Sequence, residues 1–252
     1  MTFSMIARCP ETGAFGGIIG TSSVAVGNRC LRVSHRHGAF LSQHRTDARL
    51  GDTGITLLEK GFSADEAIAQ VATGAPDIEW RQLAALDAQG RVAVYHGRRM
   101  YSIYTHSVGK DCVAIGNILD NDGVTDAMVA AFEAASGATL EERLLRGLEA
   151  GRDAGGEILE PLHSAAIRVT ASHGIDRCDL RVDYAEEAAS ALRALLVAYG
   201  DQEDILRRVA LEPDSVPVQR TLFEASIRRI IELGLEERFP TARRRESWTL
   251  RD

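Results

Sequence analysis

Predicted strands in this sequence come in hairpins, and predicted helices come in consecutive pairs. Strands are predicted over 2–8, 16–26, 38–44, 81–87, 91–95, 111–115, 164–170 and 178–183, and helices over 54–60, 64–73, 123–135, 139–150 and 185–199. A doubly wound βαβ fold would instead alternate single strands with single helices. The order therefore predicts an α+β protein, a four-layer αββα sandwich in which two stacked antiparallel sheets are flanked by helix pairs.

Two capping boxes indicate where helices begin. Ser63 and Glu66 predict the start of one helix, and Gly74 is placed to end it. Thr139 and Glu142 repeat the same spacing ahead of a later helix. Both boxes precede apolar residues at helical spacing, which supports the predicted helix pairs.

Gly200 is expected to end the last helix of the main body. This predicts an αββα domain over 1–200 and a helical carboxy-terminal extension over 201–252. The extension carries an apolar stripe, and such a stripe most often packs on the core or on another subunit. The stripe is formed by Val218, Leu222, Ala225, Ile230 and Leu233.

Composition excludes several classes of protein. The 252 residues are 45% hydrophobic and 26% charged, as in an ordinary globular protein. A net charge of −7 gives no clustered excess of Lys and Arg for a phosphate backbone. No stretch approaches the roughly 20 apolar residues that span a bilayer, and no basic segment precedes an apolar one at the amino terminus. We therefore expect a cytoplasmic protein that binds neither nucleic acid nor membrane.

The sequence does not favour a metal or another cofactor. His35 and His37 lie two residues apart, but Arg36 intervenes and no third ligand has an informative spacing. The cysteines are widely spaced and form no CxxC pair, so neither a zinc site nor a disulfide framework is indicated. They are Cys9, Cys30, Cys112 and Cys178.

Thr2 begins the first predicted strand, directly after Met1. Threonine is common in edge strands, so this position has an ordinary structural explanation. If Met1 is removed, however, Thr2 gains a free α-amine, which titrates near about 7.7–8.0 when unperturbed. A hydroxyl needs such a base to act as a nucleophile, and an amino-terminal threonine carries it on its own backbone. Thr2 is therefore a candidate nucleophile.

Several short segments of the sequence together form a recognisable pattern. The first are Thr2-Phe3-Ser4, Ala7-Arg8, Pro10-Glu11-Thr12-Gly13, Gly16 and Ala25-Val26-Gly27. The later ones are Gly61-Phe62-Ser63-Ala64-Asp65-Glu66-Ala67, Arg81-Gln82, Asp87-Ala88-Gln89-Gly90-Arg91-Val92, Gly116-Asn117-Ile118-Leu119, Ser164-Ala165-Ala166 and Asp179-Leu180-Arg181-Val182-Asp183. This pattern resembles the uncharacterised bacterial domain-of-unknown-function family 1028, and the resemblance covers about residues 2–200.

Proteins of that family are assigned to the N-terminal-nucleophile (Ntn) hydrolase superfamily. The resemblance therefore implies the αββα sandwich already predicted from the element order, together with amide-hydrolysing chemistry. Proteasome subunits also begin with a threonine strand, a hairpin and a small-residue second strand, and the start of this chain is similar in layout. A shared fold does not by itself transfer an activity.

Three residues are candidates for the catalytic chemistry. Thr2 would attack a carbonyl carbon while its α-amine shuttles the proton. Asn117, just past a predicted strand, is either an N–H donor to the developing oxyanion or an ordinary turn residue. Ser4 lies on the same strand face as Thr2, which makes it a rival nucleophile or a supporting partner.

Five residues are candidates for substrate binding. Ser22 and Ser23 end the second predicted strand, where the proteasome-like layout puts residues that support the nucleophile, although small residues there also simply save space. A polar cluster follows the third predicted strand and is either a substrate-binding group or a surface loop; it contains Gln43, His44 and Asp47.

The pair His163-Ser164 suggests a base and a nucleophile, but neighbouring residues of a strand point to opposite faces and do not simply form a dyad. The leading hypothesis is an Ntn-type hydrolase that cleaves a C–N bond of a small amide, open-chain or cyclic, through Thr2, without a cofactor and in a homo-oligomer. The alternative is a non-catalytic small-molecule-binding or assembly module on the same fold.

Overall fold

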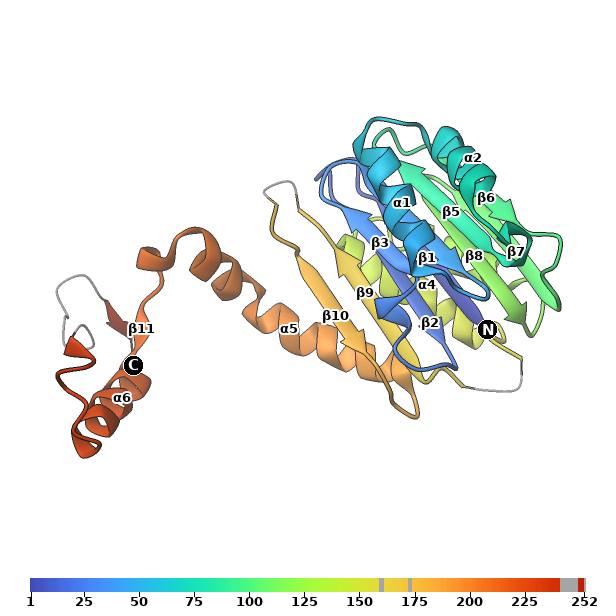
Figure 1. Cartoon of the computed structure of the whole chain (residues 1–252). Helices are drawn as coiled ribbons and strands as arrows, with labels where there is room; N and C mark the ends of the chain where they lie inside the picture. Colours follow the sequence, from blue (N-terminus) through green and yellow to red (C-terminus); the bar gives the residue numbers. More distant parts are fainter. Residues whose placement is uncertain (159–160, 172–173, 241–248, 252) are drawn as a thin grey trace. The chain divides into compact units, whose positions relative to one another are not determined.

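The computed structural model describes residues 1–158, 161–171, 174–240 and 249–251. Its contacts divide the chain into two compact units, Met1–Ala198 and Tyr199–Asp252. The first unit contains two antiparallel sheets with helices on their outer faces (Figure 1). None of the helices in the described ranges combines the length and the apolar character needed to cross a bilayer.

The larger sheet has six strands in the order β10-β9-β2-β1-β8-β7, and all neighbours are antiparallel. Its strands are β1 (Thr2–Arg8), β2 (Phe15–Thr21), β7 (Ile103–Gly109), β8 (Cys112–Leu119), β9 (Ser164–Val169) and β10 (Cys178–Val182). The smaller antiparallel sheet has the order β3-β4-β5-β6. Its strands are β3 (Leu31–Ser34), β4 (Gly38–Gln43), β5 (Gln82–Asp87) and β6 (Val92–His96).

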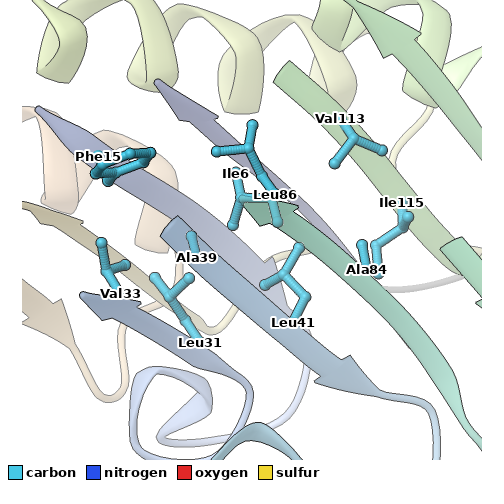
Figure 2. Packing of buried hydrophobic residues seen from close by; sticks show 10 residues of the cluster. All are labelled: Ile6, Phe15, Leu31, Val33, Ala39, Leu41, Ala84, Leu86, Val113 and Ile115. Carbon is cyan, nitrogen blue, oxygen red and sulfur yellow. The ribbon is translucent and has the colours of Figure 1, made fainter. Parts of the chain in front are cut away.

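The apolar core lies between the two sheets (Figure 2). The larger sheet contributes Ile6, Phe15, Val113 and Ile115, and the smaller sheet contributes Leu31, Val33, Ala39, Leu41, Ala84 and Leu86. Each of these side chains is at most 7% exposed. Burial of this apolar area at roughly 25 cal/mol per Å² is the main force that holds the sheets together.

Helices cover the outer face of each sheet. Helices α1 (Ala48–Glu59) and α2 (Ala64–Gly74) pack on the smaller sheet, where Phe40 is fully buried beneath them. Helices α3 (Val124–Ala134) and α4 (Leu140–Asp153) pack on the larger sheet. Glycine allows the close approach of α4 to β1, because a Cβ at Gly151 would lie 3.1 Å from the ring of Phe3. The αββα sandwich predicted from the sequence is confirmed.

Both helix starts predicted from capping boxes are present, but only the box at Ser63 is complete, and Gly74 is the last residue of α2 rather than the residue after it. Ser63 forms the complete capping box with Glu66, and the Thr139 hydroxyl accepts the N–H of Glu142. Helix α1, predicted to begin at Gly54, begins instead at Ala48, because Asp47 caps it by accepting the N–H of Arg49.

Strand predictions failed where the pattern was weak. The second strand was predicted to reach Val26, but β2 ends at Thr21, and the left-handed backbone of Ala25 leads into a 3-10 turn over Val26–Asn28. Strands β3 and β7 were not predicted. The outward face of β7 is exposed and polar in part, so its residues lack the run of apolar side chains that reveals a buried strand.

The carboxy-terminal helices also differ from prediction. Helix α5 (Ala188–Leu211) continues through Gly200, so the expected stop there was wrong. A glycine in a helix interior costs only about 1 kcal/mol, which the helix-forming residues on both sides offset.

In the second unit, α6 (Arg220–Glu232) carries Leu222, whereas Val218 belongs to β11 (Val218–Gln219). Strand β11 pairs in parallel with β12 (Leu250–Arg251). Short 3-10 turns lie over Ile78–Trp80 and Pro213–Ser215.

The packing of α1 on β4 gives a first test. A Cβ added at Gly54 would collide with the ring of the fully buried Phe40. Gly54→Ala should therefore destabilise the fold by about 1–3 kcal/mol in urea unfolding, although alanine is the better helix former. Gly74→Ala is the matched control, since a Cβ there meets nothing within 4 Å. Equal stabilities of the two variants would contradict this packing.

Candidate functional site

Several strands end together at one end of the sandwich. Strand β1 begins at Thr2, which pairs with Asn117 near the end of β8, and β2 ends at Thr21 on the other side of β1. In the smaller sheet, Gln43 at the end of β4 pairs with Gln82 at the start of β5. Antiparallel pairing thus brings together residues that lie far apart in sequence.

The Thr2 hydroxyl lies against the peptide carbonyl that precedes it. Thr2 is 7% exposed, and its Oγ donates a hydrogen bond to the carbonyl oxygen of Met1. The hydroxyl of Thr21 donates to the same oxygen at 2.5 Å. Two hydroxyl groups from neighbouring strands therefore converge on one amide carbonyl at this end of the sheet.

A buried carboxylate lies beside these hydroxyls. Glu157 is 5% exposed; one of its oxygens, Oε2, accepts the N–H of Ser22 at 2.9 Å, and the other, Oε1, has no hydrogen-bond partner. Burial raises the pKa of Glu157, while hydrogen bonds from the side chain and backbone of Ser22, the positive charge of the amino terminus and a hydrogen bond from the Thr21 side chain oppose that rise. Sequence reasoning missed Glu157, because it lies in a connection between α4 and β9 and only its bridge to Leu119 brings it here.

The backbone next to Asn117 is strained. Ile118 has a φ of 54°, and the register of β7 against β8 shifts at this point, so Ile118 is the extra residue of a β-bulge. A β-branched residue rarely adopts a left-handed backbone, and bulges are frequent next to active sites. Asn117 was predicted to follow the strand, but it lies inside β8 and is fully buried.

Buried amide side chains connect the two sheets under Thr2. Ser4 Oγ donates to Gln43 Oε1 at 2.7 Å, and Gln43 Nε2 donates to Gln82 Oε1 at 2.7 Å. Asn117 Nδ2 donates to the same Gln82 oxygen at 2.9 Å, which leaves Asn117 Oδ1 buried without a partner. The network fixes the orientation of Asn117 and gives the fully buried Ser4 the position of a supporting partner beneath Thr2.

The network continues to the surface through two histidines. Gln82 Nε2 contacts His96 Nδ1 at 3.2 Å, and His96 Nε2 contacts His106 Nδ1 at 3.0 Å. An amide nitrogen only donates, so His96 accepts at Nδ1 and carries its proton on Nε2. Burial, together with the nearby His106, lowers the pKa of His96 to about 4. His96 is therefore neutral at physiological pH.

His44 follows Gln43 and has an unusual environment. It is 5% exposed, its backbone is left-handed with a φ of 54°, and its Nδ1 lies 2.6 Å from the carbonyl oxygen of Trp80. A carbonyl only accepts, so the proton of His44 is on Nδ1. Burial lowers its pKa, and the amino terminus, Arg45 and Arg81 lower it further. His44 Nε2 is buried and has no partner.

The other candidates make mainly structural contacts. Ser22 contacts Glu157 through both its backbone N–H and its side chain, whereas Ser23 is exposed and its carbonyl accepts the Ser164 hydroxyl. Asp47 caps α1 and pairs with Arg49, which holds the pKa of Asp47 below its usual range. The structure thus gathers Thr2, Ser4, Gln43 and Asn117, with the Ser22 backbone beside them, while Ser23 and Asp47 have partners elsewhere.

The histidines considered as a metal ligand and as a catalytic base, His35 and His163, make other contacts. His35 faces Asp176, with His35 Nε2 3.4 Å from the carboxylate. His163 Nδ1 contacts the carbonyl of Ala185, whereas Ser164 donates to Ser23, so the two residues do not form a dyad. Within the described residues, no group of three or more His, Cys, Asp or Glu side chains is arranged to hold a metal ion.

Comparison with known proteins identifies one family. A family model described as "Family of unknown function (DUF1028)" matches residues 2–192. A solved structure of a DUF1028 protein from Silicibacter pomeroyi is 33% identical, with a TM-score of 0.73, over 80% of this chain and 85% of that chain. A search of curated proteins found no match.

More distant likenesses involve Anbu proteins. Anbu (ancestral beta-subunit) from Yersinia bercovieri is 9% identical, with a TM-score of 0.37, over 81% of this chain and 97% of that chain. Anbu from Hyphomicrobium sp. strain MC1 is 12% identical, with a TM-score of 0.35, over 84% of this chain and 97% of that chain. Similarity at this level supports no conclusion about chemistry.

The low pKa of His96 predicts how stability changes with acid. The unfolded chain binds the His96 proton near the ordinary value of 6.5, whereas the folded chain binds it only at about 4. Stability is therefore lost as the pH falls from about 6.5 to about 4. His96→Gln should lose less stability over this range in urea unfolding, whereas the control His37→Gln, on the β3–β4 turn, should behave like the parent. An unchanged slope in His96→Gln would contradict the neutral, buried state of His96.

Proposed function

The chain belongs to the DUF1028 family, and from that membership and the geometry around Thr2 we propose that it is an Ntn-type hydrolase of small amides. The observation that supports the proposal is the position of Thr2 at the start of β1, where the Thr21 hydroxyl donates to the carbonyl oxygen that precedes Thr2 and the buried Glu157 carboxylate lies beside them. An amide carbonyl, a nucleophilic hydroxyl and a hydrogen-bond donor to the carbonyl oxygen are what acyl transfer requires.

The reaction begins once the Met1–Thr2 bond is cleaved and the Thr2 α-amine is free. The neutral amine takes the proton of Thr2 Oγ as the oxygen attacks the substrate carbonyl carbon. The C–N bond then breaks, the leaving amine receives that proton, and an ester to Thr2 forms. The same amine then takes a proton from water as the water oxygen attacks the ester carbon. The bond between the acyl carbon and Thr2 Oγ breaks, Oγ receives that proton from the ammonium, and the acid is released.

Two groups are proposed to stabilise charge during these steps. The Thr21 hydroxyl, which donates to the carbonyl oxygen of Met1, is the first proposed donor to the oxyanion. An oxyanion donor is worth roughly 2.7–4 kcal/mol. Asn117, oriented by Gln82, is the second candidate donor, as proposed from the sequence. Glu157 is the counter-charge for the α-ammonium.

The role of Thr2 is tested by substitution and by mass. Thr2→Ala should lower amide hydrolysis by more than about a thousandfold, whereas Thr2→Ser should retain it. Intact mass spectrometry should show the active species lacking Met1, and exposure to an activated amide should add an acyl group to Thr2. A protein that keeps Met1 in full, or a Thr2→Ala variant that hydrolyses amides like the parent, would favour a non-catalytic binding module instead.

The role of Glu157 is tested by the pH profile. A carboxylate stabilises a neighbouring ammonium, so Glu157 should hold the pKa of the Thr2 α-amine up. In Glu157→Gln the acid limb of kcat/KM should move to lower pH, while the folded structure persists. Glu141→Gln, which removes a buried carboxylate on α4, is the matched control and should not move the limb. A limb that stays in place in both variants would remove Glu157 from this role.

Homo-oligomerisation and a cytoplasmic location remain proposals from the sequence. Size-exclusion chromatography with light scattering measures the first directly, and fractionation of cells that express the full chain measures the second.

A further inference from the structure

A group of cationic and aromatic side chains lies next to the proposed nucleophile. We call it the β4–β5 rim, and it consists of His44, Arg45, Trp80, Arg81 and Tyr101. His44 and Arg81 directly continue the two strands that pair at Gln43 and Gln82. Those two glutamines contact Ser4 and Asn117 on either side of Thr2, so the rim borders the same end of the sandwich.

The backbone of the β4–β5 rim is held in a strained conformation. His44 and Arg45 are consecutive non-glycine residues with left-handed backbones, at φ values of 54° and 45°. Such residues destabilise the backbone and concentrate at functional sites. The turn directs His44 inward, where its ring meets Tyr101 edge-on at 5.2 Å, and leaves Arg45 exposed.

No salt bridge to Arg45 or Arg81 forms within the described part of the chain, although the charge of Arg81 helps to lower the pKa of Asp47. Arg45 stacks over the Trp80 ring at 4.4 Å, and Arg81 Nε is buried without a hydrogen-bond partner. The nearest acids in sequence are already engaged, because Asp47 pairs with Arg49 and Glu79 pairs with Arg98. A guanidinium with a free, buried N–H is suited to a carboxylate ligand.

His44 adds an acceptor to this donor. Its Nδ1 proton is used by the Trp80 carbonyl, so its buried, unpartnered Nε2 offers a lone pair. A buried polar atom without a partner destabilises the fold, and a ligand that supplies the missing hydrogen bond would remove that penalty. The rim therefore presents one acceptor and one cationic donor to a ligand, and the complementary ligand has an N–H close to a carboxylate.

We propose that the substrate is an N-acyl amino acid, whose amide N–H donates to His44 Nε2 and whose carboxylate binds Arg81 and Arg45. The assignment of this ligand as the substrate rests on the proposed function, because it places the scissile carbonyl at Thr2. The released amino acid would carry the carboxylate, and the acyl group would pass to Thr2. Trp80 and Tyr101 would contact the body of the substrate.

Binding is measured first, on the full chain carrying Thr2→Ala, so that no turnover intervenes. The probes are acetylglycine, benzoylglycine and octanoylglycine, each compared by calorimetry with its carboxamide and with the corresponding acylsarcosine, which lacks the N–H. A charged hydrogen bond predicts that at least one acylglycine binds about tenfold to a hundredfold more tightly than its carboxamide. The acylsarcosine should also bind more weakly. Absence of binding by all three acylglycines, or equal binding of acid and carboxamide, would overturn the subsite.

The contribution of Arg81 is measured by substitution in the same background. Arg81→Gln should abolish the preference for acid over carboxamide, and Arg81→Lys should restore part of it. Arg146→Gln removes the same charge from α4, where Arg146 pairs with Glu142, and should keep the preference. Retention of the preference in Arg81→Gln would overturn the role of Arg81.

Hydrolysis is measured separately on the chain with Thr2 intact, as glycine released from the same acylglycines. Selective binding without glycine release would leave the subsite standing and contradict the proposed hydrolase. Cleavage of amides with no preference for the carboxylate would support the proposed hydrolase and contradict the subsite. The two proposals therefore fail through different results.

Discussion

The position of the candidate nucleophile depends on the alternation of side chains along β1. Ile6 points into the core between the sheets, so Ser4 and Thr2, two and four residues earlier, share its face. Phe3 and Met5 point the other way, toward Gly151 and Gly147 of α4. A slip of one residue would put Phe3 and Met5 between the sheets and send Thr2 outward. Packing of the apolar residues therefore also fixes the place of the hydroxyl.

The fold could be predicted because its signals are mostly local. Capping at Ser63, paired helices and hairpin turns are encoded within a few residues, and their order alone excluded a doubly wound sheet. The errors have physical causes too. Strand β7 is an edge strand with an exposed face, and α5 passes Gly200 because one glycine cannot stop a long helix. At these positions the structure around each residue outweighed its weak local preference.

The candidate site could be proposed from the sequence only in part. Thr2 and Ser4 were proposed from their place on a predicted strand, Asn117 from its place just past one, and all three with the help of a family resemblance. The remaining groups owe their position to contacts between distant segments. Glu157 arrives through its bridge to Leu119, and the left-handed backbone of Ile118 exists because β8 bulges against β7. No spacing of residues in the sequence predicts either contact.

Unpaired polar atoms give the strongest physical argument that this end of the sandwich is built for a ligand. Asn117 Oδ1, Glu157 Oε1, His44 Nε2 and Arg81 Nε are all buried without partners there. Each such atom costs about 1–3 kcal/mol, while a folded domain has a net stability of only about 5–15 kcal/mol. Elsewhere in the same region, Ser4, Gln43 and Gln82 satisfy one another's hydrogen bonds. Seven buried side-chain atoms in the described residues have no hydrogen-bond partner, and the other three belong to Arg29, Glu141 and Asp176. The grouping of four of the seven at this end is therefore what points to a charged and hydrogen-bonding ligand.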